Sequence, residues 1–261
     1  MPPLTNSPKA WKSWWVRLYK LSTASDISTI ELKEFINEPP VEPKLPKIPA
    51  MAMDSAGINE SFGLSEVQGH ETWQIPRPLI LIRPDFETWL NIASKPAEAP
   101  SGYKIDALLF RICENLTTNG LLDGPKVTCT HHFEISLEWG PITYHNKQYK
   151  CVGTADYGIF FGEQDHMAYH LIVLDAEQNH QGQLLACMAM VRAKRKAHGE
   201  PDSTVWGVLT DGQWFYFSRL NNEGKWSIVA YRLRRDGRGD IVNVMAYMVL
   251  QGHRNAVSAL R

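Results

Sequence analysis

Residues 167–177 read MAYHLIVLDAE, and this stretch decides the expected fold. It holds four consecutive apolar residues, Leu171 to Leu174, followed by two acids, Asp175 and Glu177. An uninterrupted apolar run of this length is typical of a strand covered on both faces of a sheet. Side chains two apart on a strand share a face, so Asp175 and Glu177 would point the same way. The stretch predicts a central strand that ends in a pair of acids.

The sequence on either side predicts the neighbours of this strand. Two β-rich runs precede it, at 126–139 (KVTCTHHFEISLEW) and 149–162 (YKCVGTADYGIFFG), with the turn-prone GPITYHNKQ between them. Helical spacing of apolar residues predicts helices at about 105–116, 184–191 and 241–249. The dipeptide Asp211-Gly212 predicts a hairpin within 203–220, and 226–233 adds a strand. From residue 103 the expected order is α-β-β-β-α-β-β-β-α, an α/β (α+β) fold with a central mixed sheet flanked by helices.

The first hundred residues differ in composition from the rest. Only three of the 16 prolines follow residue 100, at Pro125, Pro141 and Pro201. Residues 1–100 are therefore expected to form an N-terminal extension and residues 101–261 the folded domain. Because proline fixes φ and removes a backbone donor, the stretch from Pro39 to Pro49 is expected to lack a regular helix or strand. Before it, apolar residues at helical offsets predict a short helix that docks on the core or on a partner: Trp11, Trp14, Trp15, Leu18 and Leu21.

Composition narrows the class of protein but names no partner. The 261 residues are 44% hydrophobic and 21% charged with a net charge of -1, which excludes a polybasic nucleic-acid binder. The four cysteines show no paired zinc-ligand spacing and are expected to be reduced core residues. Neither a signal peptide nor a membrane span is expected, so an intracellular, nuclear or cytoplasmic protein is predicted.

Two motifs carry a resemblance to a known family. GTADYGIFFG contains Asp156, and LIVLDAEQ contains Asp175 and Glu177. With the order helix, three strands, helix and strand, residues 103–235 resemble the PD-(D/E)XK, or restriction-endonuclease-like, nuclease superfamily. The stretches DAEQ, QLLACMAMVRAKR and TVWGVLTDGQWFYFSRLNNEGKW look like fungal and bacterial members whose strand usually reads EAK. In this resemblance Asp156 takes the place of the first acid, and residues 175–177 overlay the acid-x-lysine tripeptide.

The resemblance implies a metal-dependent nuclease. Asp156, Asp175 and Glu177 would hold Mg²⁺ or Mn²⁺, whose preferred ligands are carboxylates and waters, and the reaction would be hydrolysis of nucleic-acid phosphodiester bonds. Gln183 resembles a glutamine that orients substrate or water at the metal in several families of this fold; a surface glutamine near a helix start is its other interpretation. Glu114 on the first helix could be a further acid of the site or an exposed one.

The basic segment that follows the second core helix is a candidate for nucleic-acid contact. Lys194, Arg195 and Lys196 could bind phosphates, or could complement the negative end of the helix dipole. The substrate could be DNA or RNA, and the chain could form a homodimer.

Glu177 departs from the family pattern, which has lysine at this position. A glutamate supplies no positive charge, although it can bind metal or act as a general base. The alternative to a working nuclease is a catalytically degenerate module of the same fold that binds nucleic acid or a protein partner.

Overall fold

The computed structural model describes residues 16, 19, 45–67, 75, 101–122, 129–161, 169–175, 180–233 and 238–259, without the side chains of 101–104, 129–132, 169, 174, 175, 238 and 259. The chain divides into two units, residues 1–46 and 47–261. In the first unit, Val16 and Tyr19 are helical. The five apolar residues predicted to form a helix face there lie outside the described residues.

The second unit is built on one mixed sheet, whose strand order is β1-β4-β5-β6-β7-β8-β2 with β3 paired to β4. The strands are β1 (Lys47–Pro49), β2 (Ser65–Glu66), β3 (Cys129–Tyr144), β4 (Lys147–Phe161), β5 (Tyr169–Asp175), β6 (Val205–Thr210), β7 (Trp214–Leu220) and β8 (Lys225–Arg232). The helices are η1 (Ala50–Ala52), α3 (Ser55–Phe62), α5 (Ser101–Thr118), α6 (Gln181–Ala197) and α7 (Arg238–Ala259).

The element order expected from residue 103 onward is confirmed, as is the central mixed sheet flanked by helices. Strands β3, β4 and β5 form an antiparallel meander. Helix α6 then returns the chain so that β6 lies parallel to β5. Strands β7 and β8 complete the series as antiparallel neighbours.

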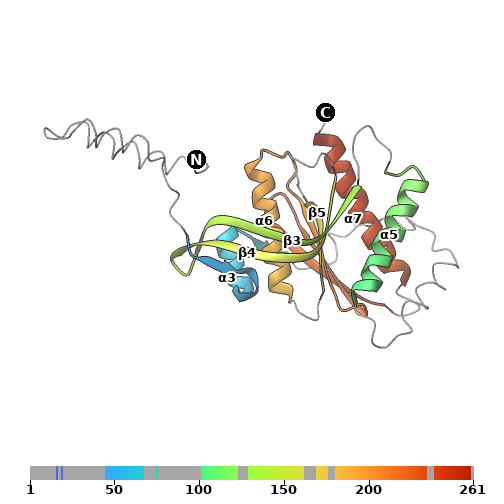
Figure 1. Cartoon of the computed structure of the whole chain (residues 1–261), viewed down its shortest axis with the longest axis horizontal. Coiled ribbons are helices and arrows are strands. Elements are labelled where there is room, and N and C mark those ends of the chain that lie inside the picture. Colours follow the sequence, from blue (N-terminus) through green and yellow to red (C-terminus); the bar gives the residue numbers. More distant parts are fainter. Residues whose placement is uncertain are drawn as a thin grey trace. The chain divides into compact units, whose positions relative to one another are not determined.

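Helices cover both faces of the sheet, as Figure 1 shows with α6 and α3 on one side and α7 and α5 on the other. Helix α6 contacts β3 to β7, and helix α7 contacts β4, β5 and β8. Two hydrophobic clusters correspond to these faces. One contains α6 with η1 and α3, and the other contains α5 and α7. Strand β5 contributes to both, with Ile172 in the first and Leu171 and Val173 in the second.

The predicted domain boundary at residue 100 is corrected by residues 47–66. Strand β1 pairs in parallel with β4, and β2 pairs in parallel with β8. Helix α3 packs on α6, and its Asn59 Oδ1 accepts a hydrogen bond from the Trp226 indole at 3.0 Å. The expectation of no strand between Pro39 and Pro49 is also wrong, because β1 includes Pro49. A short parallel edge contact tolerates this proline, since only a few ladder bonds are made.

Two smaller expectations can be compared with the structure. Cys113, Cys151 and Cys187 are free thiols buried in the core, as predicted, while the side chain of Cys129 is outside the described set. Among the described residues, no helix is both long and apolar enough to cross a membrane.

Candidate functional site

Asp156 and Asp175 lie on neighbouring strands at the same end of one ladder. Tyr157 of β4 pairs with Val173 of β5, and both acids come one or two residues beyond this pair in the same direction. Asp175 is the last residue of β5 and pairs with Thr210 of β6. The two acids therefore come from adjacent strands, and the Asp156 side chain is half-buried.

The backbone is irregular where Asp156 lies. Ala155 belongs to the cluster on the α6 face, whereas Tyr157 packs against the cluster on the α7 face. Residues two apart on a regular strand share a face, so β4 must twist sharply between them. On β3, Glu134 sits between the partners of these two residues with a φ of 50°. Left-handed backbone at a non-glycine residue costs roughly 1–3 kcal/mol and is concentrated at functional sites.

Helix α6 brings a further polar side chain to the same region. The Cys187 thiol donates to the Thr154 carbonyl oxygen at 3.7 Å. Burial, together with nearby negative charge from Cys151 and Asp156, raises the pKa of Cys187 to about 12. Asp156 is thus close to this part of α6. Gln183 is one helical turn before Cys187, so the two share a helix face.

Gln183 is a buried amide with an unused acceptor. Its residue is 6% exposed, and its Oε1 has no hydrogen-bond partner within the described part of the chain. Its backbone N–H is satisfied by Nδ1 of His180, the N-cap of α6, at 3.2 Å. The other ring nitrogen of His180 is 3.1 Å from the Met51 carbonyl oxygen, which ties the start of α6 to η1. Buried polar atoms are nearly always paired, so the unpaired Oε1 is a candidate contact for a ligand or an ion.

The basic segment of α6 divides into exposed and buried members. Lys194 and Lys196 are exposed. Arg195 is 2% exposed and donates from its guanidinium to the Asp202 carbonyl oxygen at 2.7 Å. Arg192 is 7% exposed and likewise bonds main-chain carbonyls, those of Asn221 and Asn222. Arg195 is therefore a structural cation, and of the three predicted phosphate contacts only the lysines lie on the surface.

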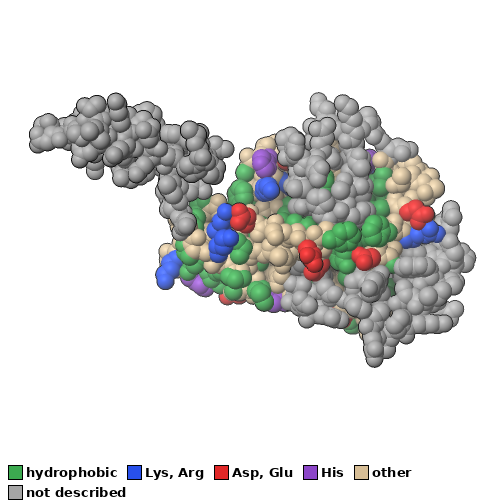
Figure 2. All heavy atoms as spheres, in the orientation of Figure 1, with side chains coloured by type: hydrophobic (Ala, Val, Ile, Leu, Met, Phe, Trp, Pro, Cys, Tyr) green, Lys and Arg blue, Asp and Glu red, His purple; other side chains and the backbone are tan. Residues whose placement is uncertain are grey.

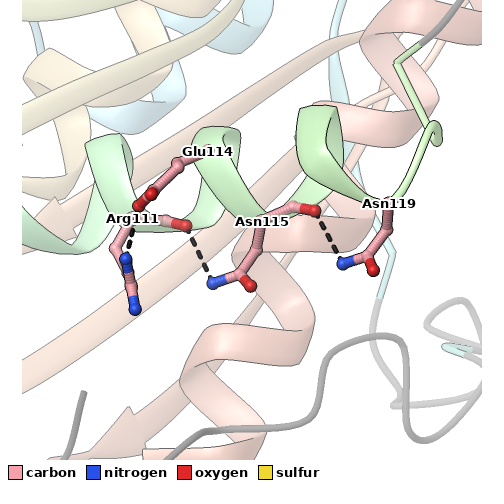
Figure 3. Close-up of polar contacts among 4 residues, drawn as sticks. All are labelled: Arg111, Glu114, Asn115 and Asn119. Carbon is pink, nitrogen blue, oxygen red and sulfur yellow. Dashed lines mark hydrogen bonds and ion pairs between the residues drawn. The ribbon is translucent and has the colours of Figure 1, made fainter. Parts of the chain in front are cut away.

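Glu114 lies on the exposed side of α5. Figure 3 shows its carboxylate turned to Arg111, with Oε2 2.6 Å from the guanidinium, next to Asn115 and Asn119, which bond back to helix carbonyls. The Glu114 side chain is 59% exposed. This geometry is that of a surface ion pair on a helix and gives Glu114 no link to Asp156.

The structure does not test the prediction that the carboxylates of Asp156, Asp175 and Glu177 lie close together. Glu177 and the side chain of Asp175 lie outside the described residues, and among the side chains that are described no three His, Cys, Asp or Glu come together to hold a metal. Comparison of the sequence with protein-family models and with curated proteins finds no match.

The structure also singles out residues that the sequence did not. Phe133 of β3 is 55% exposed, and Lys47 and Lys150 are partners across the β1–β4 ladder. The exposure of Phe133 could have been predicted from strand alternation within 133–139. The pairing of Lys47 with Lys150 could not, because it joins residues far apart in the chain.

Proposed function

We propose that the chain is a nuclease of the restriction-endonuclease-like type that uses Mg²⁺ or Mn²⁺ to hydrolyse phosphodiester bonds of nucleic acid. The observation that carries the proposal is the placement of Asp156 and Asp175 on adjacent strands, beside a helix whose Gln183 has a buried, unbonded oxygen. Asp156, Asp175 and Glu177 would be the ligands, and Gln183 would orient substrate or water.

The donor set suits a hard cation. Carboxylate and amide oxygens are the ligands of Mg²⁺ and Mn²⁺, whereas zinc sites favour sulfur and nitrogen. The two thiols nearest the region are unsuitable because burial raises the pKa of Cys151 to about 11 and that of Cys187 to about 12. A bound cation would supply charge stabilisation at the phosphate and a more acidic water. Glu177, in place of the usual lysine, would bind the cation or accept a proton.

Asp175→Ala and Glu177→Lys test the proposal. We expect the wild-type protein to bind Mn²⁺ in calorimetry and to cut DNA or RNA slowly, and Asp175→Ala to lose both, because a carboxylate ligand is removed. Glu114→Gln is the control, since it neutralises an exposed acid of α5, and it should keep both activities.

Three outcomes separate the possibilities. Cleavage that survives in Asp175→Ala overturns the proposed site. A wild type that is inert while Glu177→Lys gains metal-dependent cleavage identifies a degenerate module of the same fold, which binds nucleic acid or a protein partner. A wild type that neither binds metal nor cuts any nucleic acid overturns the enzymatic proposal.

Gln183→Leu distinguishes a functional amide from a structural one. Replacing a buried amide whose oxygen is unbonded by an apolar side chain of similar size should leave the free energy of unfolding unchanged or raise it by about 1 kcal/mol. Metal-dependent cleavage should fall at least tenfold if the oxygen serves the site. A large loss of stability in denaturant unfolding would instead show that the amide supports the fold.

A further inference from the structure

We propose that the exposed face of the β3–β4 hairpin binds single-stranded nucleic acid, with Phe133 stacking on a base and two lysines contacting phosphates. The lysines are Lys47 of β1 and Lys150 of β4, which are partners across the β1–β4 ladder. This inference rests on the proposed function for the identity of its ligand and adds the form of the nucleic acid and the path it takes.

One face of the β3–β4 hairpin packs against the core, so the opposite face is accessible to a ligand. Alternate residues of β3 and β4 pack toward α6: Ile135, Leu137, Trp139, Ile142, Tyr149, Cys151 and Ala155. Strand alternation turns the residues between them to the opposite face. These include Ser136, Glu138 and Thr154, all exposed, together with Lys150, which is partly exposed.

The lysines gather around one acid. Lys150 Nζ is 2.7 Å from Glu138 Oε1, and Lys47 is the ladder partner of Lys150. The hydrogen bond from Lys150 and the positive charges of Lys150, Lys47 and Lys194 lower the pKa of Glu138. Two lysines beside a single carboxylate leave a net positive charge on the exposed face, and Figure 2 shows blue side chains beside a red one on this end of the hairpin. Such a patch matches a phosphate backbone.

The aromatic end of the face is held in place. Phe133 is 55% exposed, and its ring contacts Tyr157 edge-on with centroids 5.5 Å apart. Phe133 and Tyr157 are ladder partners, so the ring has a fixed support. A rigid, solvent-facing ring can stack on a base of a single strand. In a duplex the faces of the bases are stacked on one another and are not accessible.

The candidate site lies between these two ends. Asp156 follows the lysine end and precedes Tyr157 on β4, and at about 3.3 Å per residue Lys150 is roughly 20 Å from Tyr157 along the strand. A nucleic-acid strand that spans both ends would therefore pass Asp156. The predicted path thus runs past the β4 position of Asp156, one of the proposed metal ligands.

Fluorescence anisotropy with labelled DNA and RNA oligonucleotides in EDTA tests the inference without cleavage. We expect single strands to bind more tightly than duplexes of the same sequence. Phe133→Ala should weaken binding about tenfold, the loss of one stacked base. Lys47→Gln and Lys150→Gln should each reduce the slope of log affinity against log salt by about 0.7. Phe110→Ala and Lys225→Gln, which alter exposed residues on α5 and β8, are the controls and should bind as wild type.

The outcomes separate this inference from the proposed function. Tighter binding of duplex, or Phe133 and lysine variants that bind as wild type, overturns the inference even if the protein cuts nucleic acid. Single-strand binding that depends on Phe133 and the lysines supports it, even when metal binding and cleavage are absent and the proposed enzymatic function fails. Urea unfolding of Phe133→Ala should match that of wild type, which shows that the variant is folded.

Discussion

His170 is a buried histidine of β5. It is 3% exposed, and its ring lies edge-on to Phe161 at 5.7 Å between centroids. Burial, with a smaller contribution from the positive charge of Arg195, holds the pKa of His170 well below its ordinary value. The folded protein therefore keeps the ring uncharged under conditions in which an unfolded chain would protonate it.

We expect this histidine to make the fold sensitive to acid. Below a pH of about 6.5 the unfolded chain takes up a proton that the folded chain does not, so the free energy of unfolding decreases as pH falls, by at most about 1.4 kcal/mol per unit. Above that pH both states are neutral at His170 and the effect is absent. Urea unfolding at pH 7.5 and 5.5 should show a smaller difference for His170→Asn than for wild type. An equal difference in both proteins would contradict the assignment.

The basic segment shows how far sequence could assign single residues. Leu184, Cys187, Met188 and Val191 are apolar at helical spacing and are buried in α6. Four residues after Met188 and Val191 come Arg192 and Arg195. Helical spacing thus contained the signal that both arginines point inward. The run of basic residues grouped Arg195 with Lys194 and Lys196, because a run of charges does not show the direction of each side chain on the helix.

Arg192 connects α6 to the β7–β8 turn, a contact that the sequence does not predict. It donates from Nε to the Asn221 carbonyl oxygen at 3.0 Å and from a terminal nitrogen to that of Asn222 at 2.9 Å, which fixes the β7–β8 turn to α6. We expect Arg192→Ala to lower the free energy of unfolding by about 3 kcal/mol, because two charge-assisted hydrogen bonds are lost. Lys196→Ala, an exposed change on the same helix, should stay within about 0.5 kcal/mol of wild type. Chemical denaturation measures both, and equal midpoints would refute the role of Arg192.

Among the elements, long strands and helices were predictable and the shortest ones were not. The hairpin β3–β4, strand β5 and helices α5, α6 and α7 each carry a hydrophobic period in the sequence. Strands β1 and β2 have three and two residues, which is too short for a period, and their places are set by partners at Lys150 and Trp226. The candidate site shows the same difference. The hydrophobic periods of β4 and β5 were enough to predict that Asp156 and Asp175 lie on adjacent strands. The unpaired oxygen of Gln183 could not be predicted, because it depends on how side chains pack in the folded protein.

At the scale of the whole molecule, the folded body begins near residue 47 instead of residue 101. The segment 47–66 contributes five residues to the cluster under α6: Ile48, Ala50, Met53, Ile58 and Leu64. Full burial of a large aliphatic side chain is worth about 1.5–3 kcal/mol. Four such side chains approach the total stability of a domain, which is about 5–15 kcal/mol. The segment is therefore part of the core.

Truncation should reveal this boundary. A chain of residues 47–261 should unfold cooperatively with a midpoint close to that of the full chain, because every described member of both clusters is retained. A chain of residues 67–261 should lose cooperative unfolding, because α6 then exposes apolar surface that residues 47–66 cover.

Point variants of the full chain control for a truncated protein that fails to fold for other reasons. Ile58→Ala, at a site that is 0% exposed, should cost about 2–5 kcal/mol, whereas Met51→Ala, at 60% exposure, should cost little. Matching midpoints for residues 67–261 and the full chain would return the boundary to residue 100.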